Sequence, residues 1–218
     1  MRDDLFGDIT TAEAFDAAFA GRACHFVDHV GGLRPMAMER WAEAPDQADD
    51  EIFLARSSGR TLDVGCGPGR LAAELRARDV PALGIDVSGE AVRMARRRGA
   101  HVLRRDVFSR LPHEGLWNCV LLADGNIGIG GDPVTLLRRV CGLLRPGGTA
   151  IVEVAHEEAG LRRERWRLRV DGRTTPPFAW AVVGADAIAA IAHEAGLALS
   201  EMTSVGRRQA AVLVSPAA

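Results

Sequence analysis

The sequence predicts an α/β fold in which a parallel sheet carries helices on both faces, that is, a doubly wound sheet. Short apolar runs rich in valine, isoleucine and leucine alternate with helical patterns over residues 60–154. This alternation is typical of strands joined by right-handed helical crossovers. A glycine-rich turn follows the first of these runs, and two later runs end at Asp86 and Asp106. These three observations define the expected core.

Composition limits the possible functions. The 218 residues suffice for one α/β domain with a modest addition, and 47% hydrophobic with 26% charged residues is an ordinary globular balance. A net charge of −2 argues against a broad nucleic-acid surface, which normally needs a strongly basic face. We therefore expect no nucleic-acid partner. A monomer and a homodimer are both compatible with the sequence.

The cysteines and the apolar runs bear on location. None of the four cysteines lies in a C-x-x-C pattern: Cys24, Cys66, Cys119 and Cys141. We interpret them as reduced thiols of a cytoplasmic protein, with no metal site. The charged first residues precede no apolar signal region, and no apolar run is long enough to span a membrane. We therefore expect a soluble chain without membrane contacts.

Residues 1–58 precede the core and are expected to form an N-terminal helical arm, with the catalytic domain over 59–218. A helix is predicted over 11–20, capped by Thr10 or Thr11, and residues 36–56 look helical in pieces. On a helix, the spacing of His25 and His29 would place both imidazoles on one face. No third metal ligand is evident, so surface or substrate-pocket histidines are expected instead.

The core elements follow in order. Strands are predicted over 61–64, 80–85, 101–105, 118–122 and 149–154, with helices over 69–78, 88–99 and from 132 onward. Ser88 and Asp132 are expected helix caps, and Pro133 suits the first helical position. An insertion over 157–183 contains an alternating strand at 166–170 and a turn at Asp171-Gly172. A helix over 184–195 and strands over 197–205 and 209–214 complete the chain.

The turn after the first strand reads Gly65-x-Gly67-x-Gly69, and Asp63 stands two positions before it. Glycines without a Cβ let a backbone approach a ligand closely, next to helix amides that favour anions. Arg70 occupies the place of the third glycine of the dinucleotide fingerprint. The segment resembles motif I of the class I S-adenosylmethionine-dependent methyltransferases. The resemblance extends to sequence motifs over 62–154, including the segment 143–148. From there to residue 214 it concerns only the order of helices and strands.

This resemblance implies a Rossmann-like, seven-stranded sheet whose last strand is antiparallel. It also implies S-adenosylmethionine as cofactor and S-adenosylhomocysteine as product. Asp86, 21 positions after Gly65, is placed to accept both ribose hydroxyls, or else serves only as a helix N-terminal acid. The family pattern puts Asp106 at the adenine amino group, Val87 and Val107 against the ring, and Asp63 near the methionine end. The predicted cofactor-binding residues are Asp63, Gly65, Cys66, Gly67, Gly69, Asp86, Val87, Asp106, Val107, Ala123, Arg40 and Trp41.

The sequence says less about the methyl acceptor than about the cofactor. Methyl transfer is an in-line displacement that relies on proximity and alignment and needs no protein nucleophile. Where a base is useful, the candidate catalytic residues are Asp124, Asn126 and His156, which follow the fourth and fifth strands. Asp124 is equally interpretable as a turn former. Motifs of enzymes that methylate nucleic-acid amino groups or protein arginines are not evident, which favours a small-molecule acceptor by elimination.

Two other functions compete with a small-molecule methyltransferase: a non-catalytic S-adenosylmethionine-binding scaffold and a nicotinamide-dependent oxidoreductase. Arg70 and the second strand-end acid Asp106 weigh against the latter. The arm is expected to cover the cofactor and, with the 166–180 hairpin, to line the acceptor pocket. The alternative is that their aromatic residues merely anchor peripheral segments. The residues behind this hypothesis are Phe6, Phe19, His25, His29, Arg40, Trp41, Trp166, Phe178 and Trp180.

Overall fold

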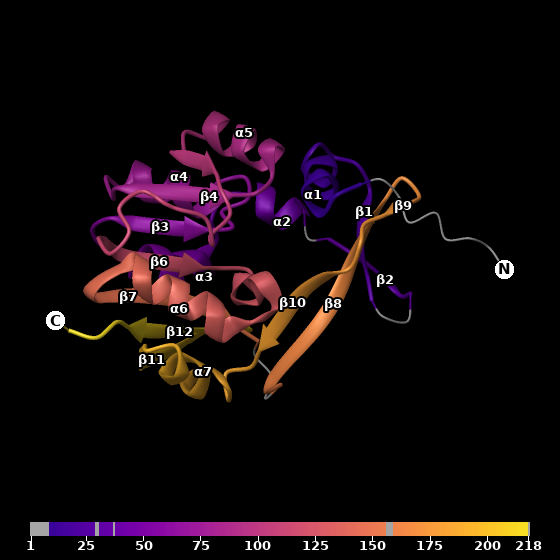
Figure 1. Ribbon diagram of the computed structural model, residues 1–218. Helices are drawn as coiled ribbons and strands as arrows, with labels where there is room; N and C mark the ends of the chain where they lie inside the picture. The colour runs from indigo at the N-terminus through magenta and orange to yellow at the C-terminus, as the bar shows by residue number, and fades with distance from the viewer. Residues whose placement is uncertain (1–8, 29–30, 37, 156–158, 218) are drawn as a thin grey trace.

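The computed structural model describes residues 9–28, 31–36, 38–155 and 159–217 (Figure 1). Its main element is a seven-stranded sheet with the strand order β11-β12-β7-β6-β3-β4-β5. The strands are β3 (Thr61–Val64), β4 (Ala82–Asp86), β5 (Val102–Arg104), β6 (Trp117–Leu122), β7 (Leu144–Val154), β11 (Ala198–Val205) and β12 (Arg208–Val214). Neighbours from β7 to β5 pair in parallel, and β12 pairs antiparallel with both β7 and β11. The predicted fold class, including the antiparallel last strand, is confirmed.

Helices cover both faces of this sheet. The helices α6 (Pro133–Leu143) and α7 (Ile188–Glu194) pack on one face in a cluster with the apolar side chains of β3, β6 and β7. On the other face, α4 (Arg70–Ala77) and the short helix η1 (Asp50–Leu54) pack against β6 and β7, and α5 (Gly89–Arg97) packs against α4 and β5. Between α3 (Gln47–Asp49) and β3, the residues Ile52, Phe53 and Leu54 of η1 are buried, which anchors this end of the arm to the sheet.

The expected helix caps are confirmed. Ser88 Oγ accepts a hydrogen bond from Ala91 N at 3.0 Å at the start of α5, and Asp132 Oδ1 accepts one from Val134 N at 3.2 Å before α6. Thr10 forms a capping box with Glu13 at the start of α1 (Thr11–Phe19). Each side chain satisfies a backbone N–H that has no partner within its helix. Within the described ranges, no helix combines the length and apolar character needed to cross a membrane.

A second, antiparallel sheet was only partly predicted. It has the order β10-β8-β1-β2, with β9 also paired to β8. Its strands are β1 (Cys24–Val27), β2 (Leu33–Pro35), β8 (Leu161–Val170), β9 (Arg173–Thr174) and β10 (Phe178–Val183). The expected hairpin turn is present, since Asp171 and Gly172 both have positive φ, 47° and 78°. The helical interpretation of the segment around His25 is wrong, because Cys24–Val27 pairs with β8 as a strand. His29 lies outside the described residues.

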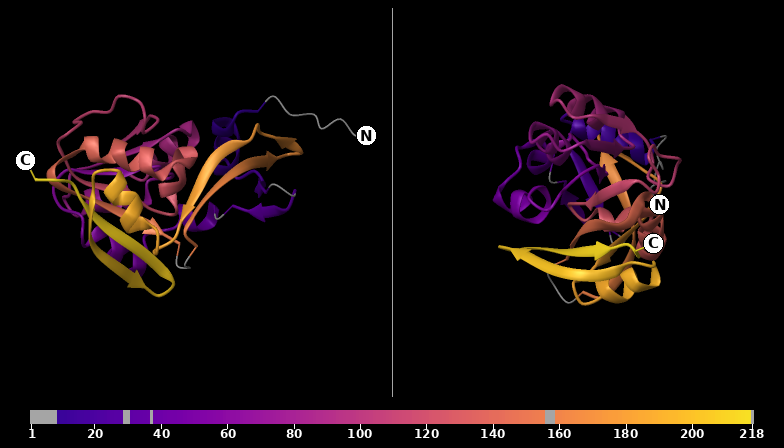
Figure 2. Two further views of the ribbon diagram at one scale, coloured as in Figure 1. Left: turned by 60° about the horizontal axis from the view of Figure 1, so that its bottom comes forward. Right: turned by 90° about the vertical axis from the view of Figure 1, so that its left-hand side faces the viewer.

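The arm and the hairpin form one unit, which we call the cap: α1, β1, β2, α2 (Met38–Ala42), β8, β9 and β10. The cap has its own hydrophobic cluster, in which side chains of α1 and β1 pack against Leu168 and Val170 of β8. Figure 2 shows the long strands of the hairpin leaving the seven-stranded sheet and running out beside the arm. Asp16 of α1 connects the cap to the start of α5, where Asp16 Oδ1 accepts from Glu90 N at 3.0 Å and from the Ser88 hydroxyl.

The glycine turn between β3 and α4 brings these parts together. Its three glycines all have positive φ, which only glycine adopts without strain: 69° at Gly65, 52° at Gly67 and 78° at Gly69. A Cβ at Gly69 would lie 2.6 Å from the Ala95 Cβ of α5. The missing side chain at Gly69 therefore allows α5 to pack directly on the turn.

We predict that Gly69→Ala destabilises the protein more than Gly99→Ala. Both positions have positive φ, 78° and 93°, but nothing lies within 4 Å of a Cβ at Gly99. The left-handed backbone should cost about 1–2 kcal/mol in both variants. The contact with Ala95 should add about 1–3 kcal/mol for Gly69. Urea unfolding measures both, and equal losses would mean that α5 moves away freely.

Candidate functional site

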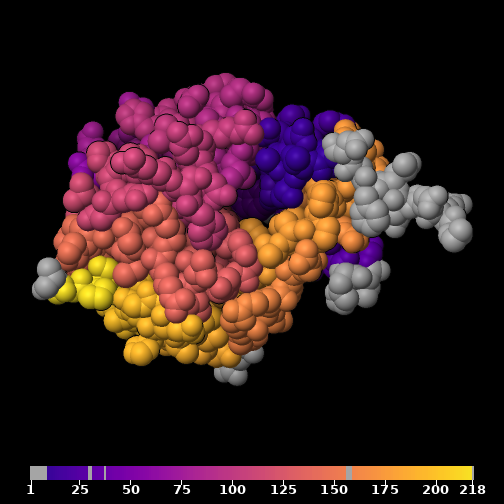
Figure 3. Space-filling view, in the orientation of Figure 1, coloured from indigo at the N-terminus to yellow at the C-terminus, as the bar shows by residue number. Residues whose placement is uncertain are grey.

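A cavity of about 530 Å³ lies at the carboxyl ends of β3, β4, β5 and β6. The glycine turn and the residues after these strands form one wall, and the cap forms the other. In Figure 3 the surface is hollowed where the indigo arm, the magenta core and the orange hairpin meet. In an open parallel sheet, this edge is where ligands bind.

Carboxylates stand at the ends of adjacent strands along the first wall. Asp86 Oδ2 accepts from Gly67 N at 2.9 Å and Asp86 Oδ1 from Ser88 N at 2.8 Å, so this side chain bridges the glycine turn and α5. Asp106 borders the cavity mouth, where its Oδ1 accepts from Phe108 N at 2.9 Å. Asp63 lies in β3 and is 2% exposed. Three acids, in β3, at the end of β4 and after β5, therefore border the same cavity.

Burial determines the protonation of this wall. Desolvation, together with the charges of Asp124 and Asp86, raises the pKa of the Asp63 carboxyl from 3.8 to about 7. Burial also raises the pKa of Asp86 and that of the Cys66 thiol, which stands between the first two glycines. The ionised form of Asp63 thus lacks compensating positive charge, which a cationic ligand can supply.

Asn126 and Asp124 follow β6 and border the cavity. Asn126 Nδ2 donates to Val64 O at 2.9 Å and to Gly65 O at 3.0 Å, so the amide holds the start of the glycine turn. Asp124 has a φ of 51° and its backbone N–H donates to Glu153 Oε2 at 2.7 Å. The backbone of Asp124 therefore has the turn conformation that the sequence offered as one alternative, while its carboxylate faces the site.

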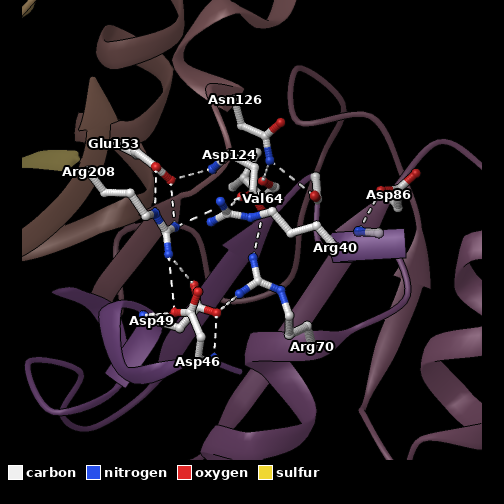
Figure 4. Close-up of polar contacts among 12 residues, drawn as sticks. Arg40, Asp46, Asp49, Val64, Arg70, Asp86, Asp124, Asn126, Glu153 and Arg208 are labelled. Carbon is white, nitrogen blue, oxygen red and sulfur yellow. Dashed lines mark hydrogen bonds and ion pairs between the residues drawn. The ribbon is translucent and has the colours of Figure 1, made fainter. Parts of the chain in front are cut away.

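Arginines neutralise the acids at the floor of the site (Figure 4). Arg70 Nη2 contacts Asp124 Oδ2 at 2.7 Å, and Arg70 Nη1 is paired with Asp49 of the arm. Arg208 binds Glu153 through two hydrogen bonds of 2.8 and 2.9 Å and reaches Asp49 Oδ1 at 2.8 Å. The side chains of Arg70 and Asp49 are 5% and 1% exposed. This buried network joins α4, β7 and β12 to the arm.

Most predicted site residues border the cavity: Asp63, Gly65, Cys66, Gly67, Asp86, Val87, Asp106, Val107, Ala123, Trp41, Asp124 and Asn126. Gly69 is not part of the lining, because it packs against α5. Arg40 does not border the cavity itself, but its Nη2 lies 3.5 Å from Oδ1 of the lining residue Asp124. His156, the remaining catalytic candidate, lies outside the described residues, as does Phe6.

The cap contributes seven aromatic side chains to the lining: Phe15, Phe19, Phe26, Trp41, Trp166, Phe178 and Trp180. Phe15 and Phe26 were not among the predicted residues, although Phe15 shares a helical stripe with Phe19. His25 is absent from the lining residues, which does not fit a role in the pocket. Arg70 was noticed only as a departure from a fingerprint. Its pairing with Asp49 depends on a contact that no local pattern reveals.

We predict that Arg70→Met lowers the free energy of unfolding by about 3–5 kcal/mol, because it removes the buried cation shared by Asp49 and Asp124. Arg138→Met is the matched control, since Arg138 and its partner Glu194 are 57% and 65% exposed. The control should lose less than about 1 kcal/mol. Urea unfolding monitored by circular dichroism measures both. A similar small loss in the two variants would contradict a structural role for the network.

The raised pKa of Asp63 predicts a pH-dependent stability difference from Asp63→Asn, which cannot titrate. The folded state binds the Asp63 proton up to about pH 7 and the unfolded chain only to about 3.8. Wild-type stability relative to the variant should therefore fall as pH rises between about pH 4 and about pH 7, and stay level above. Denaturant titrations across this range, without ligand, test this. A constant difference would mean that Asp63 is ionised throughout.

Known proteins resemble this chain in sequence and fold. An uncharacterized methyltransferase of Mycobacterium tuberculosis is 34% identical over 112 residues, which are 49% of this chain and 55% of the relative. The chain thus spans about half the length of the curated relatives it matches. A Bacteroides fragilis methyltransferase solved with S-adenosyl-L-homocysteine superimposes with a TM-score of 0.78, at 20% identity over 94% of each chain.

A second solved structure is similar over most of its length. It is the 1,6-didemethyltoxoflavin-N1-methyltransferase of Burkholderia thailandensis, with a TM-score of 0.61 at 16% identity, covering 96% of this chain and 92% of that chain. At these identities the superpositions show the fold alone. The methyltransferase domain family matches residues 38–201, most of the seven-stranded sheet and part of the cap. The chain belongs to the methyltransferase domain family.

Proposed function

We propose that this protein is an S-adenosylmethionine-dependent methyltransferase acting on a small molecule. The observation that carries the proposal is the glycine turn with carboxylates of three adjacent strands around it, where Gly67 N is bound by Asp86. Family membership and the fold support the same cofactor class. The Bacteroides protein was solved with S-adenosyl-L-homocysteine, and the Burkholderia enzyme with that product and 1,6-didemethyltoxoflavin. The Burkholderia enzyme supports a small-molecule acceptor.

The residues fit an adenosine group. A carboxylate offers about four acceptor positions, and the amides of Gly67 and Ser88 use one on each Asp86 oxygen. Asp86 therefore keeps capacity for two ribose hydroxyls. Val87 is 42% exposed, which leaves an apolar face free at the cavity for a planar base. Asp106 at the mouth would accept from the adenine amino group.

The methionine end would lie between Asp63 and Arg40. Ionised Asp63 would attract the ammonium or sulfonium charge. Nε of Arg40 is buried without a hydrogen-bond partner within the described part of the chain, whereas its Nη2 lies 3.5 Å from Asp124 Oδ1. We propose that Nε is the donor available for a carboxylate. Trp41 on the same helix borders the cavity and would cover this end.

When bound, S-adenosylmethionine supplies a methyl carbon that an acceptor lone pair takes as the carbon–sulfur bond breaks, its electrons remaining on sulfur. The protein's part is to align the acceptor and exclude water. Asn126 keeps the glycine turn in place, and we propose that it positions the reacting groups. Asp124 and His156 remain our candidates to receive an acceptor proton. The Arg70 contact holds the Asp124 carboxylate toward the site.

The proposal predicts that S-adenosylhomocysteine binds and that NAD does not, measured by calorimetry. Asp86→Ala should weaken S-adenosylhomocysteine binding by about 2–4 kcal/mol, because two charge-assisted hydrogen bonds are lost. Glu90→Ala is the matched control: it removes an acid from the first turn of α5 outside the cavity lining. The control should bind like wild type.

Three outcomes distinguish the competing functions. Preferential NAD binding would overturn the cofactor assignment in favour of an oxidoreductase. Equal weakening in Asp86→Ala and Glu90→Ala would reduce Asp86 to a helix N-terminal acid. Cofactor binding without S-adenosylhomocysteine production in a screen of small acceptors would favour the non-catalytic scaffold.

A further inference from the structure

The aromatic residues of this chain are concentrated at one place. The chain has 7 phenylalanines and 4 tryptophans, and seven of these rings line the cavity from the cap. Two other rings, Phe53 and Trp117, lie in the sheet core at 0% and 1% exposure. All seven cap rings are instead half-buried. Rings that only anchored the cap would be buried like the core pair, so these rings keep surface available for a ligand.

Contacts between the rings hold them in place before a ligand arrives. Phe26 and Trp166 meet edge to face, with centroids 4.6 Å apart and planes at 75°. Phe178 and Trp180 do the same at 6.4 Å and 87°. Edge-to-face pairs are favoured by the ring quadrupoles, and they fix ring orientation. The cap therefore presents a preorganised aromatic surface.

The cap brings little polarity to the cavity. Besides the seven rings, its described lining residues are Thr11 and Ala179, and neither is charged. The Arg34 guanidinium already stacks on the Trp166 ring at 5.1 Å, which disfavours a second cation there. On the opposite wall, Arg70 neutralises Asp124. The acceptor side thus favours a flat apolar ligand over a cationic one.

We propose that the cap selects a planar, uncharged ring system that carries the methyl-accepting atom, such as a ring hydroxyl or ring nitrogen. This inference rests on the proposed function, since it assigns the second half of the same cavity to the acceptor. The cap rings other than Trp41, which we assigned to the cofactor, are the specificity-determining surface. The lone pair of the accepting oxygen or nitrogen forms the new bond to the methyl carbon as the carbon–sulfur bond of the cofactor breaks, with its electrons remaining on sulfur. The proton of the accepting O–H or N–H group leaves to a base or to water.

Calorimetry with a matched pair of probes tests whether the aromatic surface of the cap prefers flat rings. The probes are 2-naphthol, which is planar, and decahydro-2-naphthol, which has the same carbon skeleton without flat rings. Each is titrated into protein saturated with S-adenosylhomocysteine. We expect 2-naphthol to bind at least about tenfold more tightly, because only flat rings stack well on the cap. Equal affinities, or tighter binding of tetramethylammonium than of 2-naphthol, would overturn the proposal.

Two variants locate the effect. Phe178→Leu should weaken 2-naphthol binding about fivefold and change decahydro-2-naphthol and S-adenosylhomocysteine binding less than about twofold. Phe108→Leu is the control, because Phe108 is 44% exposed and outside the cavity lining. It should leave all three affinities unchanged. A loss of 2-naphthol binding that is equal in the two variants would contradict the assignment to the cap.

The cofactor measurement separates this inference from the proposed function. Absence of S-adenosylhomocysteine binding would overturn the proposed function. The two probes would then be titrated into the protein alone. Tighter binding of 2-naphthol would still support a cap that selects flat rings, and equal affinities would overturn it. Normal S-adenosylhomocysteine binding with equal affinities for the two probes would overturn the proposal that the cap selects planar rings. It would leave the cofactor assignment intact.

Discussion

The structure depends on one backbone constraint, the left-handed conformation of the three glycines Gly65, Gly67 and Gly69. A different part of the molecule occupies the space beside each of them. Built Cβ atoms would lie 2.7 Å from the Asn126 amide, 3.7 Å from the Phe19 ring and 2.6 Å from Ala95, in that order. The loop after β6 and α5 therefore approach the turn closely where Gly65 and Gly69 have no side chain, and the Phe19 ring of the cap lies beside Gly67. The same turn directs Gly67 N toward Asp86.

A second constraint follows from the sheet itself. Parallel strands that end at one edge bring their terminal acids together, and like charges there raise the free energy of the folded state. Arg70 and Arg208 relieve part of this repulsion, since they bind Asp124 and Glu153 at the strand ends and Asp49 of the arm. Within the described ranges, Asp63 has no such ion pair, and its pKa rises to about 7. Asp63 is thus a carboxylate that lacks a cationic partner in the described part of the chain, and in the proposed function a sulfonium or ammonium group would lie beside it.

The sequence predicted the elements whose signals are local. The glycine turn, the caps at Ser88 and Asp132, and the Asp171-Gly172 turn each depend on a few neighbouring residues. The strands β1 and β2 escaped prediction because they are short and because β1 pairs with β8, which lies far along the chain, with Cys24 opposite Val170. For the same reason the Arg70–Asp49 pair was not foreseen. The alternation of strands and helices predicted the parallel part of the sheet, and the resemblance to the methyltransferases predicted seven strands with the last one antiparallel.

The two halves of the site consequently differ in how they can change. The cofactor side is built from strand ends and the glycine turn, where a substitution also disturbs the packing of α4, α5 or the buried ion pairs. The acceptor side that we propose is built from the cap, whose hydrophobic cluster is separate from those of the sheet. Its rings are half-buried, so an exchange of one ring for another removes little core packing. Acceptor choice can therefore vary while the sheet and the cofactor wall stay unchanged.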